Sequence, residues 1–227
     1  MLTFTFDAAE TPAQRVARIA REAVADGPMG CWLRRDRYAS FLDIWDMSDD
    51  YSRLLDSLHS GAVLAGVKTS CAVDASAVLG YAGRKLHKPW HADGTWGITS
   101  WLGLGFDDES WVDAVDPKTG PREPEEGFVF YRGGKQASNG HVGTFSLRLA
   151  NGLWRTVEGG GNLTVSDGST LTAAQRKATN GTVMRMTPEG KDPLAVDSLG
   201  RHLTGWWDTN RIGLPTGEEV LERLAAQ

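Results

Sequence analysis

Apolar residues near the start of the chain recur every three or four positions, which is the spacing of one face of an α-helix. The pattern runs from Val16 to Val24 and follows a Thr-Pro-Ala-Gln sequence that begins at Thr11. Thr is a preferred N-cap, Pro fits the first helical position, and a Gln three residues after the cap can close a capping box. We therefore expect a helix that starts at Pro12 and stops before Gly27-Pro28.

A second helical pattern starts at Cys71. Its apolar face consists of Ala72, Ala75, Val78, Leu79 and Ala82. Gly83 follows, and glycine is the usual residue for the left-handed conformation that ends a helix. The sequence thus predicts a helix whose first turn contains Cys71.

Beyond residue 127 the pattern changes to the two-residue alternation of β-strands. It appears in five segments, at 127–133, 140–150, 153–161, 182–188 and 202–209. Asn151-Gly152, between the second and third segments, is a typical hairpin turn. The last twelve residues return to a helical pattern, for which Thr216 is the expected N-cap.

Helices therefore come first and strands later, which is the order of an α+β fold with an antiparallel sheet. Residues 31–47 and 49–61 predict short helical segments, and the charged, Pro-rich stretch 116–127 predicts a loop before an antiparallel meander. We expect one compact domain, in which an N-terminal helical part (1–62) packs on a core formed by residues 63–227.

Charge and hydropathy exclude several classes of function. The net charge is −5 and no basic stripe is present, so nucleic acid is not an expected partner. No apolar run reaches the roughly 18 residues that a membrane-spanning helix needs. The N-terminus shows no apolar segment after a basic start, which predicts synthesis in the cytoplasm without a signal peptide.

The chain has only two cysteines, Cys31 and Cys71, which do not form a disulfide framework. We interpret Cys31 as structural. His87 and His91 have a spacing that would suit a metal on a helix, but Pro89 between them argues against a regular helix. No metal or cofactor is therefore expected.

Tryptophan is unusually frequent, with nine residues in all. Four of them fall in one segment broken by glycine and proline: Trp90, Trp96, Trp101 and Trp111. Such a cluster either fills the core or lines a groove for a glycan or a peptide. In the second case Trp96 and Trp101 are candidate substrate contacts.

Three residues together suggest nucleophilic catalysis. Cys71 lies at a predicted helix N-terminus, where unpaired N–H groups and the helix dipole favour a thiolate. His141 and Glu158 lie in adjacent predicted strands on the two sides of the Asn151-Gly152 turn. If the register agrees, their side chains lie side by side. A thiol, an imidazole and a group that orients the imidazole are the set that a cysteine hydrolase needs.

The order of short motifs resembles the papain-like NlpC-type and CHAP (cysteine, histidine-dependent amidohydrolase/peptidase) superfamily. These motifs are TSCAVDASAVLGYAG, EEGFVFYRGG, HVGTF and TVEGGGN, and the resemblance covers about residues 65–162. It extends to the Gly-Trp strand within residues 200–212 if that strand corresponds to a similar one in related domains. The resemblance implies a papain-like fold with the catalytic cysteine at a helix N-terminus.

By this resemblance Cys71 is the nucleophile, His141 the general base and Glu158 the orienting residue. The chain has Glu126-Gly127 where many members have Gly-Asp before the middle strand. Glycines follow Glu158 where CHAP members often have Gly-Asn, so Asn162 is an alternative third member. Ser70 is either a polar residue before the helix or part of the substrate mouth.

The family mostly hydrolyses amide bonds of peptidoglycan, so the resemblance implies an amidase or endopeptidase. Without a signal peptide such an enzyme needs another route to the wall. An antibacterial effector, which would require an immunity protein as partner, and a phage-type lysin both fit. The rival functions are a cytoplasmic cysteine hydrolase or deamidase and a non-catalytic binding domain on the same fold.

Overall fold

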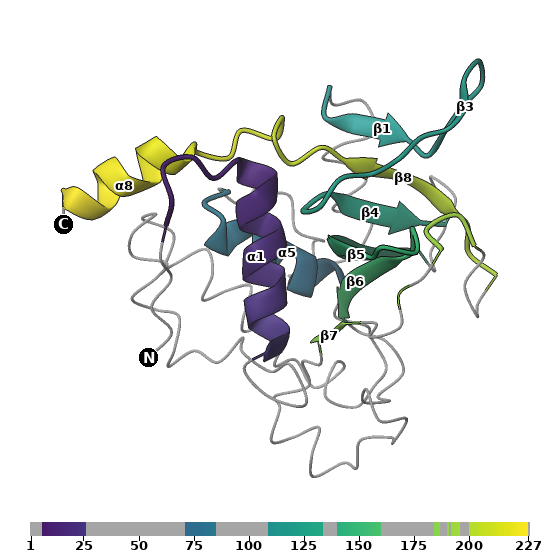
Figure 1. Ribbon diagram of the computed structural model, residues 1–227, viewed down its shortest axis with the longest axis horizontal. Coiled ribbons are helices and arrows are strands. Elements are labelled where there is room, and N and C mark those ends of the chain that lie inside the picture. Colours follow the sequence, from purple (N-terminus) through teal and green to yellow (C-terminus); the bar gives the residue numbers. More distant parts are fainter. Residues whose placement is uncertain are drawn as a thin grey trace, which may run out of the picture.

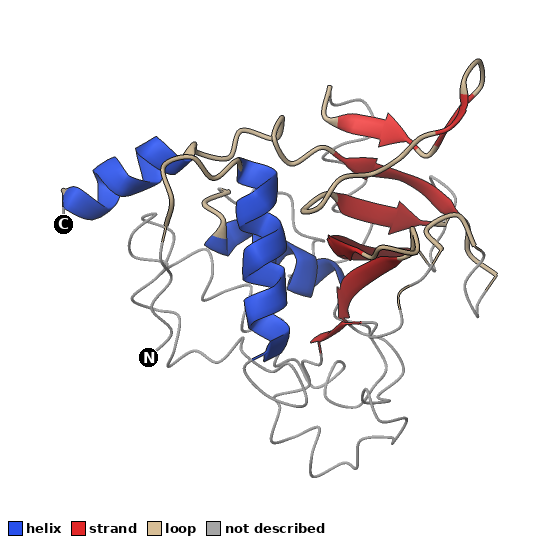
Figure 2. Ribbon diagram, in the orientation of Figure 1, coloured by secondary structure: helices blue, strands red, loops and turns tan. Residues whose placement is uncertain are grey.

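The computed structural model of the protein describes residues 6–25, 71–84, 109–133, 140–159, 184–186, 190, 192–195 and 200–226. Within these ranges the chain has an α+β fold, with helices to one side and an antiparallel sheet to the other (Figures 1 and 2). The fold class and the antiparallel sheet are therefore confirmed. The predicted helices at 31–47 and 49–61 and the boundary near residue 62 lie outside the described residues.

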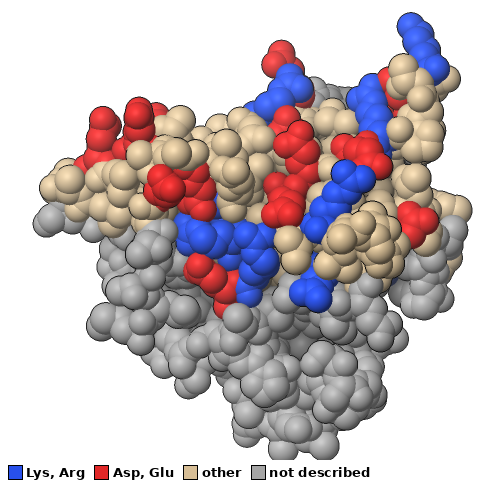
Figure 3. Space-filling model, in the orientation of Figure 1, with Lys and Arg blue, Asp and Glu red and all other residues tan. Residues whose placement is uncertain are grey.

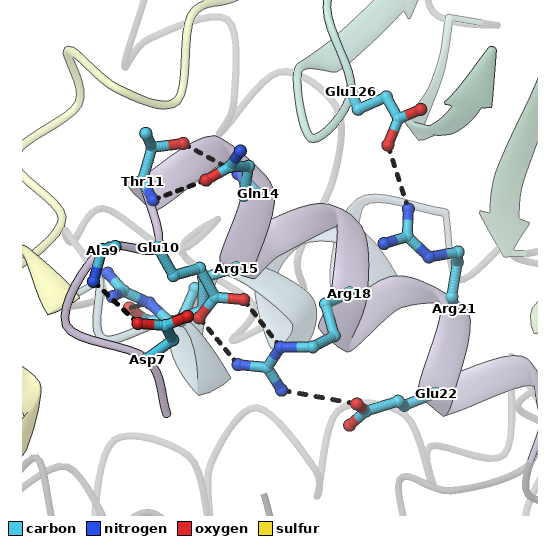
Figure 4. Close-up of polar contacts among 11 residues, drawn as sticks. Asp7, Ala9, Glu10, Thr11, Gln14, Arg15, Arg18, Arg21, Glu22 and Glu126 are labelled. Atoms are coloured by element: carbon cyan, nitrogen blue, oxygen red, sulfur yellow. Dashed lines mark hydrogen bonds and ion pairs between the residues drawn. The ribbon is translucent and has the colours of Figure 1, made fainter. Parts of the chain in front are cut away.

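Helix α1 (Pro12–Ala25) begins where the sequence predicts. The capping box is present, because the Thr11 N–H donates to Gln14 Oε1 (2.9 Å) and the Gln14 N–H donates to Thr11 Oγ1 (3.2 Å). The half-buried Arg18 forms an ion pair with Glu10 (2.7 Å), as Figure 4 shows. These local contacts fix the first turn before any packing is considered.

Helix α5 (Cys71–Tyr81) also matches its prediction. Ala75, Val78 and Leu79 are buried. Gly83 has a φ of 100°, and the Arg84 N–H donates to the Leu79 carbonyl (3.0 Å), which closes the helix end. The expected face is buried, but residues 78–82 are buried without interruption, so this end of the helix packs on more than that face.

The main sheet has the strand order β1-β8-β4-β5-β6-β7, and all its pairs are antiparallel. Its strands are β1 (Trp111–Asp113), β4 (Val129–Arg132), β5 (His141–Arg148), β6 (Trp154–Gly159), β7 (Met184–Met186) and β8 (Leu203–Trp207). Strands β4 to β8 are the five that the sequence predicts.

The expected meander is wrong at its last strand. Strands β4 to β7 follow one another, but β8 returns to pair with β4 and β1. In this central position Trp206 faces Phe130 and both are buried. An edge position would leave these two large apolar side chains in water, which costs free energy in proportion to the exposed area.

The loop predicted at 116–127 is also partly wrong, because the structure has a small hairpin there. Strands β2 (Val115–Asp116) and β3 (Gly120–Pro121) pair, and the hairpin projects beyond the sheet (Figure 1). Asp116 Oδ1 accepts from the Lys118 N–H (2.7 Å) and the Thr119 N–H (3.1 Å). A side chain that satisfies the turn in this way stabilises strands too short to show periodicity.

Strand β1 was not predicted either. It contains Trp111, whose ring lies 4.8 Å from that of Trp207 at a steep angle. Trp111 also lies over Gly205, where an added Cβ would come within 2.4 Å of Trp111 Cζ2. The half-buried Trp111 thus packs on the sheet edge, and the other three tryptophans of its segment lie outside the described residues.

The C-terminal helix α8 (Gly217–Ala225) carries the predicted N-cap. The Glu219 N–H donates to Thr216 Oγ1 (3.2 Å) and the Thr216 N–H donates to Glu219 Oε2 (2.6 Å). No helix in the described ranges has the length and apolar character that crossing a membrane requires. On the face drawn in Figure 3, acidic and basic side chains are interspersed rather than gathered into a region of one sign.

Candidate active site

Cys71 is the first residue of α5, so its thiol lies at the amino end of a helix. Its sulfur is not part of a disulfide, and the residue is buried, with 2% of its surface exposed. Helices α1 and α5 both pack against the part of the sheet that contains β5 and β6. This packing brings the thiol to the end of the sheet where β5 starts.

His141 is the first residue of β5, and Glu158 is the penultimate residue of β6. The register of these strands pairs Thr144 with Val157, so one step further Gly143 faces Glu158. His141 is two residues before Gly143 and therefore on the same side of the sheet. His141 Nε2 lies 2.8 Å from Glu158 Oε2, and both residues are buried.

Gly143 makes this diagonal contact possible. A Cβ at this position would lie 2.9 Å from Glu158 Cγ and 2.6 Å from Phe130 Cζ. Both distances are shorter than carbon atoms adopt without displacement. The glycine of the His-Val-Gly sequence thus leaves room for the Glu158 side chain to reach His141.

A second residue holds the carboxylate from the other side. Thr156 is two residues before Glu158 on β6, so the two side chains share a face. The Thr156 hydroxyl donates to Glu158 Oε1. Each carboxylate oxygen thus has a buried partner, which is what keeps a buried charge stable. Sequence reasoning missed Thr156, although its spacing from Glu158 was visible.

The imidazole also bonds the thiol. Burial alone would lower the pKa of His141, but hydrogen bonds to Cys71 and Glu158, together with the charges of both, outweigh burial and raise this pKa from 6.5 to about 9. Since Glu158 occupies Nε2, the thiol is left with Nδ1. The three side chains form a continuous chain of hydrogen bonds in the order thiol, imidazole, carboxylate.

Tyr131 borders this end of the sheet. A Cβ on Gly140, the residue before His141, would lie 2.4 Å from the Tyr131 hydroxyl. Burial raises the pKa of Tyr131; the charge of Arg201 opposes this shift and that of Cys71 adds to it. The phenol therefore keeps its proton at neutral pH. The sequence analysis did not single out Tyr131.

Four other candidates lie outside the described residues: Ser70, Trp96, Trp101 and Asn162. Of the two candidates for the third member, the structure describes Glu158, which contacts His141, and it does not test Asn162. Among those residues no three His, Cys, Asp or Glu side chains are grouped as a metal site would need.

An arrangement of this kind can do specific chemistry. An imidazolium held between a carboxylate and a sulfur favours the thiolate, which is the nucleophilic form of cysteine. The same imidazolium carries a proton that it can give to a leaving group. Comparisons of the chain with protein-family models, with curated proteins and with solved structures find no match.

Proposed function

We propose that this protein is a cysteine hydrolase that cleaves amide bonds of peptidoglycan. The observation that carries the proposal is the hydrogen-bonded chain of Cys71, His141 and Glu158 at the start of α5. A buried cysteine needs no such partners for packing, since the thiol behaves as a small apolar group. Three polar groups in this order are, in contrast, what nucleophilic attack by sulfur requires.

The reaction would proceed in two halves. The Cys71 thiolate attacks the amide carbonyl carbon, and the electron pair of the C=O bond moves to oxygen. When the tetrahedral intermediate collapses, the C–N bond breaks and His141 gives its proton to the leaving amine. Water then attacks the thioester while His141 takes one of its protons, and the carboxylic acid and thiolate are released.

Glu158 keeps the imidazole in place throughout this cycle. Its bond to Nε2 fixes the ring so that Nδ1 faces sulfur, and its charge favours the imidazolium. The oxyanion of the intermediate would bind N–H groups at the amino end of α5, which have no partner within the helix.

A papain-like fold is part of the proposal. It is supported by a cysteine that begins a helix, a base on the first residue of a strand and an acid on the next strand across a hairpin. The resemblance of the motifs around Cys71 and His141 to NlpC-type and CHAP enzymes supports peptidoglycan as substrate. The sheet order with β8 between β1 and β4 is the feature of topology that a related structure would have to share.

The deciding experiment is digestion of purified peptidoglycan, with the fragments identified by mass spectrometry. Wild-type protein should release fragments whose masses name the bond, and Cys71→Ala and His141→Ala should release none. Thr144→Ser, a change of a buried polar residue on β5 outside the hydrogen-bonded chain, is the matched control and should remain active. If the wild type releases nothing, peptidoglycan is not the substrate and protein or small amides should be tested.

The compartment of action can be tested separately. We propose that the enzyme reaches the wall of a target cell as an antibacterial effector or as a phage-type lysin, and that an effector would be neutralised by an immunity protein. Expression with a periplasmic leader should then lyse cells, whereas Cys71→Ala should not. Toxicity confined to cytoplasmic expression would instead indicate an intracellular amide substrate.

A further inference from the structure

Arg132 is a buried cation that the proposed reaction does not use. It is the last residue of β4 and only 4% of its surface is exposed. Removing a guanidinium from water is costly unless its N–H groups find acceptors. The burial of Arg132 near the candidate site therefore calls for acceptors that offset this cost.

Its acceptors are main-chain carbonyls of the segment 192–195. Arg132 Nη1 donates to the Ala195 carbonyl (2.8 Å) and Nη2 donates to the Pro193 carbonyl (3.1 Å). The segment is itself a tight turn, because the Leu194 N–H donates to Asp192 Oδ1 (2.9 Å). Arg132 thus attaches a preformed turn to the end of β4.

The turn is attached beside the catalytic base. Arg132 pairs directly with His141 in the register of β4 and β5, so the two side chains leave the sheet on the same side with Cβ atoms about 5 Å apart. Phe130 confirms this arrangement, since its ring lies 6.2 Å from the His141 ring and 5.6 Å from Arg132 Cζ. The guanidinium therefore places the turn one side chain away from the imidazole.

This turn exposes a large apolar side chain, Leu194, beside the carboxylate of Asp192 and the small Ala195. Leu194 is 40% exposed and is one of three large apolar side chains that the described residues expose; Val115 and Leu221 are the others. Leu194 alone among them lies on a segment held by a buried charge next to His141. An exposed leucine on a fixed turn offers an apolar contact that needs no rearrangement.

We propose that the turn 192–195, held by Arg132, is a wall of the substrate cleft on the side of His141, and that Leu194 contacts an uncharged side chain of the segment that leaves with the amine. The inference rests on the proposed function. In that reaction His141 protonates the leaving amine, so the part of the substrate that carries the amine lies on the side of His141. It assigns the substrate an apolar or small residue, not an acidic one, just beyond the cleaved bond.

Labelling of Cys71 tests this without a known substrate. The probes are iodoacetamide, which needs only the thiol, and two epoxysuccinyl amino-acid amides, one with a leucine and one with an aspartate side chain. Wild-type protein should react faster with the leucine probe. Leu194→Ser should lower that preference by about fivefold, the size expected for loss of an exposed apolar contact, and should leave the iodoacetamide rate unchanged.

Leu221→Ser is the matched control, since Leu221 has a similar exposure (38%) but lies on α8. It should keep the wild-type preference. Arg132→Lys, which cannot bond both carbonyls in the same geometry, should lose the preference as Leu194→Ser does. If that variant does not fold, Leu194→Ser decides the question alone.

The outcomes are separable. Equal probe preference in wild type and Leu194→Ser would overturn the role of the turn and leave the thiol mechanism standing. Failure of all three probes to modify Cys71 in the wild type would overturn the proposed cysteine chemistry, and this inference with it.

Discussion

Replacement of Gly143 by alanine is the most direct test of how the site is built. The new Cβ would lie 2.6 Å from Phe130 Cζ and 2.9 Å from Glu158 Cγ, so at least one neighbour must move. Phe130 is fully buried and packs on Phe145, with ring centroids 5.1 Å apart. Glu158 reaches into the site on a flexible side chain that bonds His141 and Thr156, and we expect this side chain to move instead of the Phe130 ring.

The size of the effect follows from the contacts at risk. Overpacking a well-filled site costs about 1–3 kcal/mol of the free energy of unfolding. Loss of the bond between Glu158 and His141 costs about 1.5–3 kcal/mol, because one partner is charged. If that bond is needed to orient the base, kcat/KM should fall about 10- to 100-fold. The loss of activity should thus exceed what a small loss of stability explains.

The assay pairs unfolding by urea with the pH dependence of Cys71 alkylation. Val142→Ala is the control, since Val142 is the buried neighbour on β5 whose side chain leaves the strand on the other face. It should lower stability and leave alkylation unchanged. Adding Phe130→Leu to Gly143→Ala should restore stability but not reactivity. If Gly143→Ala alone retains wild-type alkylation at every pH, our account of the glycine is refuted.

Two further predictions concern charge and backbone. Because the fold raises the pKa of His141 to about 9, the imidazole should stay protonated up to that pH, and activity should decline as the pH rises through it. Glu158→Gln removes one cause of the raised pKa and should move the NMR titration of His141 to lower pH. An unchanged titration would show that Glu158 is not coupled to the ring. Gly127→Ala should prevent folding or lower the melting temperature strongly, because its φ is 90° and its Cβ would lie 1.8 Å from the Ala13 carbonyl oxygen. Gly120→Ala has a similar φ of 83° but meets nothing within 4 Å, so it should cost only about 1 kcal/mol; equal losses in the two variants would contradict the role assigned to the contact with α1.

Elements with strong local signals could be predicted from the sequence. The capping boxes at Thr11 and Thr216 set the starts of α1 and α8, because cap and third residue bond within a few positions of each other. The two-residue alternation similarly located β4, β5 and β6. In each case the signal that identifies the element lies within its own stretch of sequence.

Strand order could not be predicted in the same way. The position of β8 depends on Trp206 facing Phe130, and strands β5, β6 and β7 lie between these two residues in the sequence. Strand β1 is held against β8 by the contact between the rings of Trp111 and Trp207. A strand of three residues is too short to show a recognisable periodicity. Contacts between segments that are distant in the sequence determine the positions of β8 and β1, and the hydrophobic pattern of a single segment does not reveal such contacts.

The site shows the same division. Cys71, His141 and Glu158 were found because a helix start and a hairpin bring them into order along the chain. The sequence analysis missed two supporting residues. Gly143 leaves space that a side chain would fill, and Thr156 donates a hydrogen bond to a carboxylate oxygen of Glu158. The sequence thus predicted the three candidate residues, and the packing that holds them required the structure.

Helix α1 shows why the N-terminal segment belongs to the same functional unit as the candidate site. Arg15 is fully buried; burial lowers its pKa to about 10, while the charges of Glu10 and Glu219 oppose that shift. Its side chain donates to the Ala82 carbonyl just after α5 (3.2 Å) and to the Pro215 carbonyl just before α8. One side chain on the first helix therefore ties the far end of the helix that carries Cys71 to the last segment of the fold. Since a shift of α5 by about 1 Å would weaken the hydrogen bond between the thiol and His141, the position of the thiol depends on α1 as well as on the sheet.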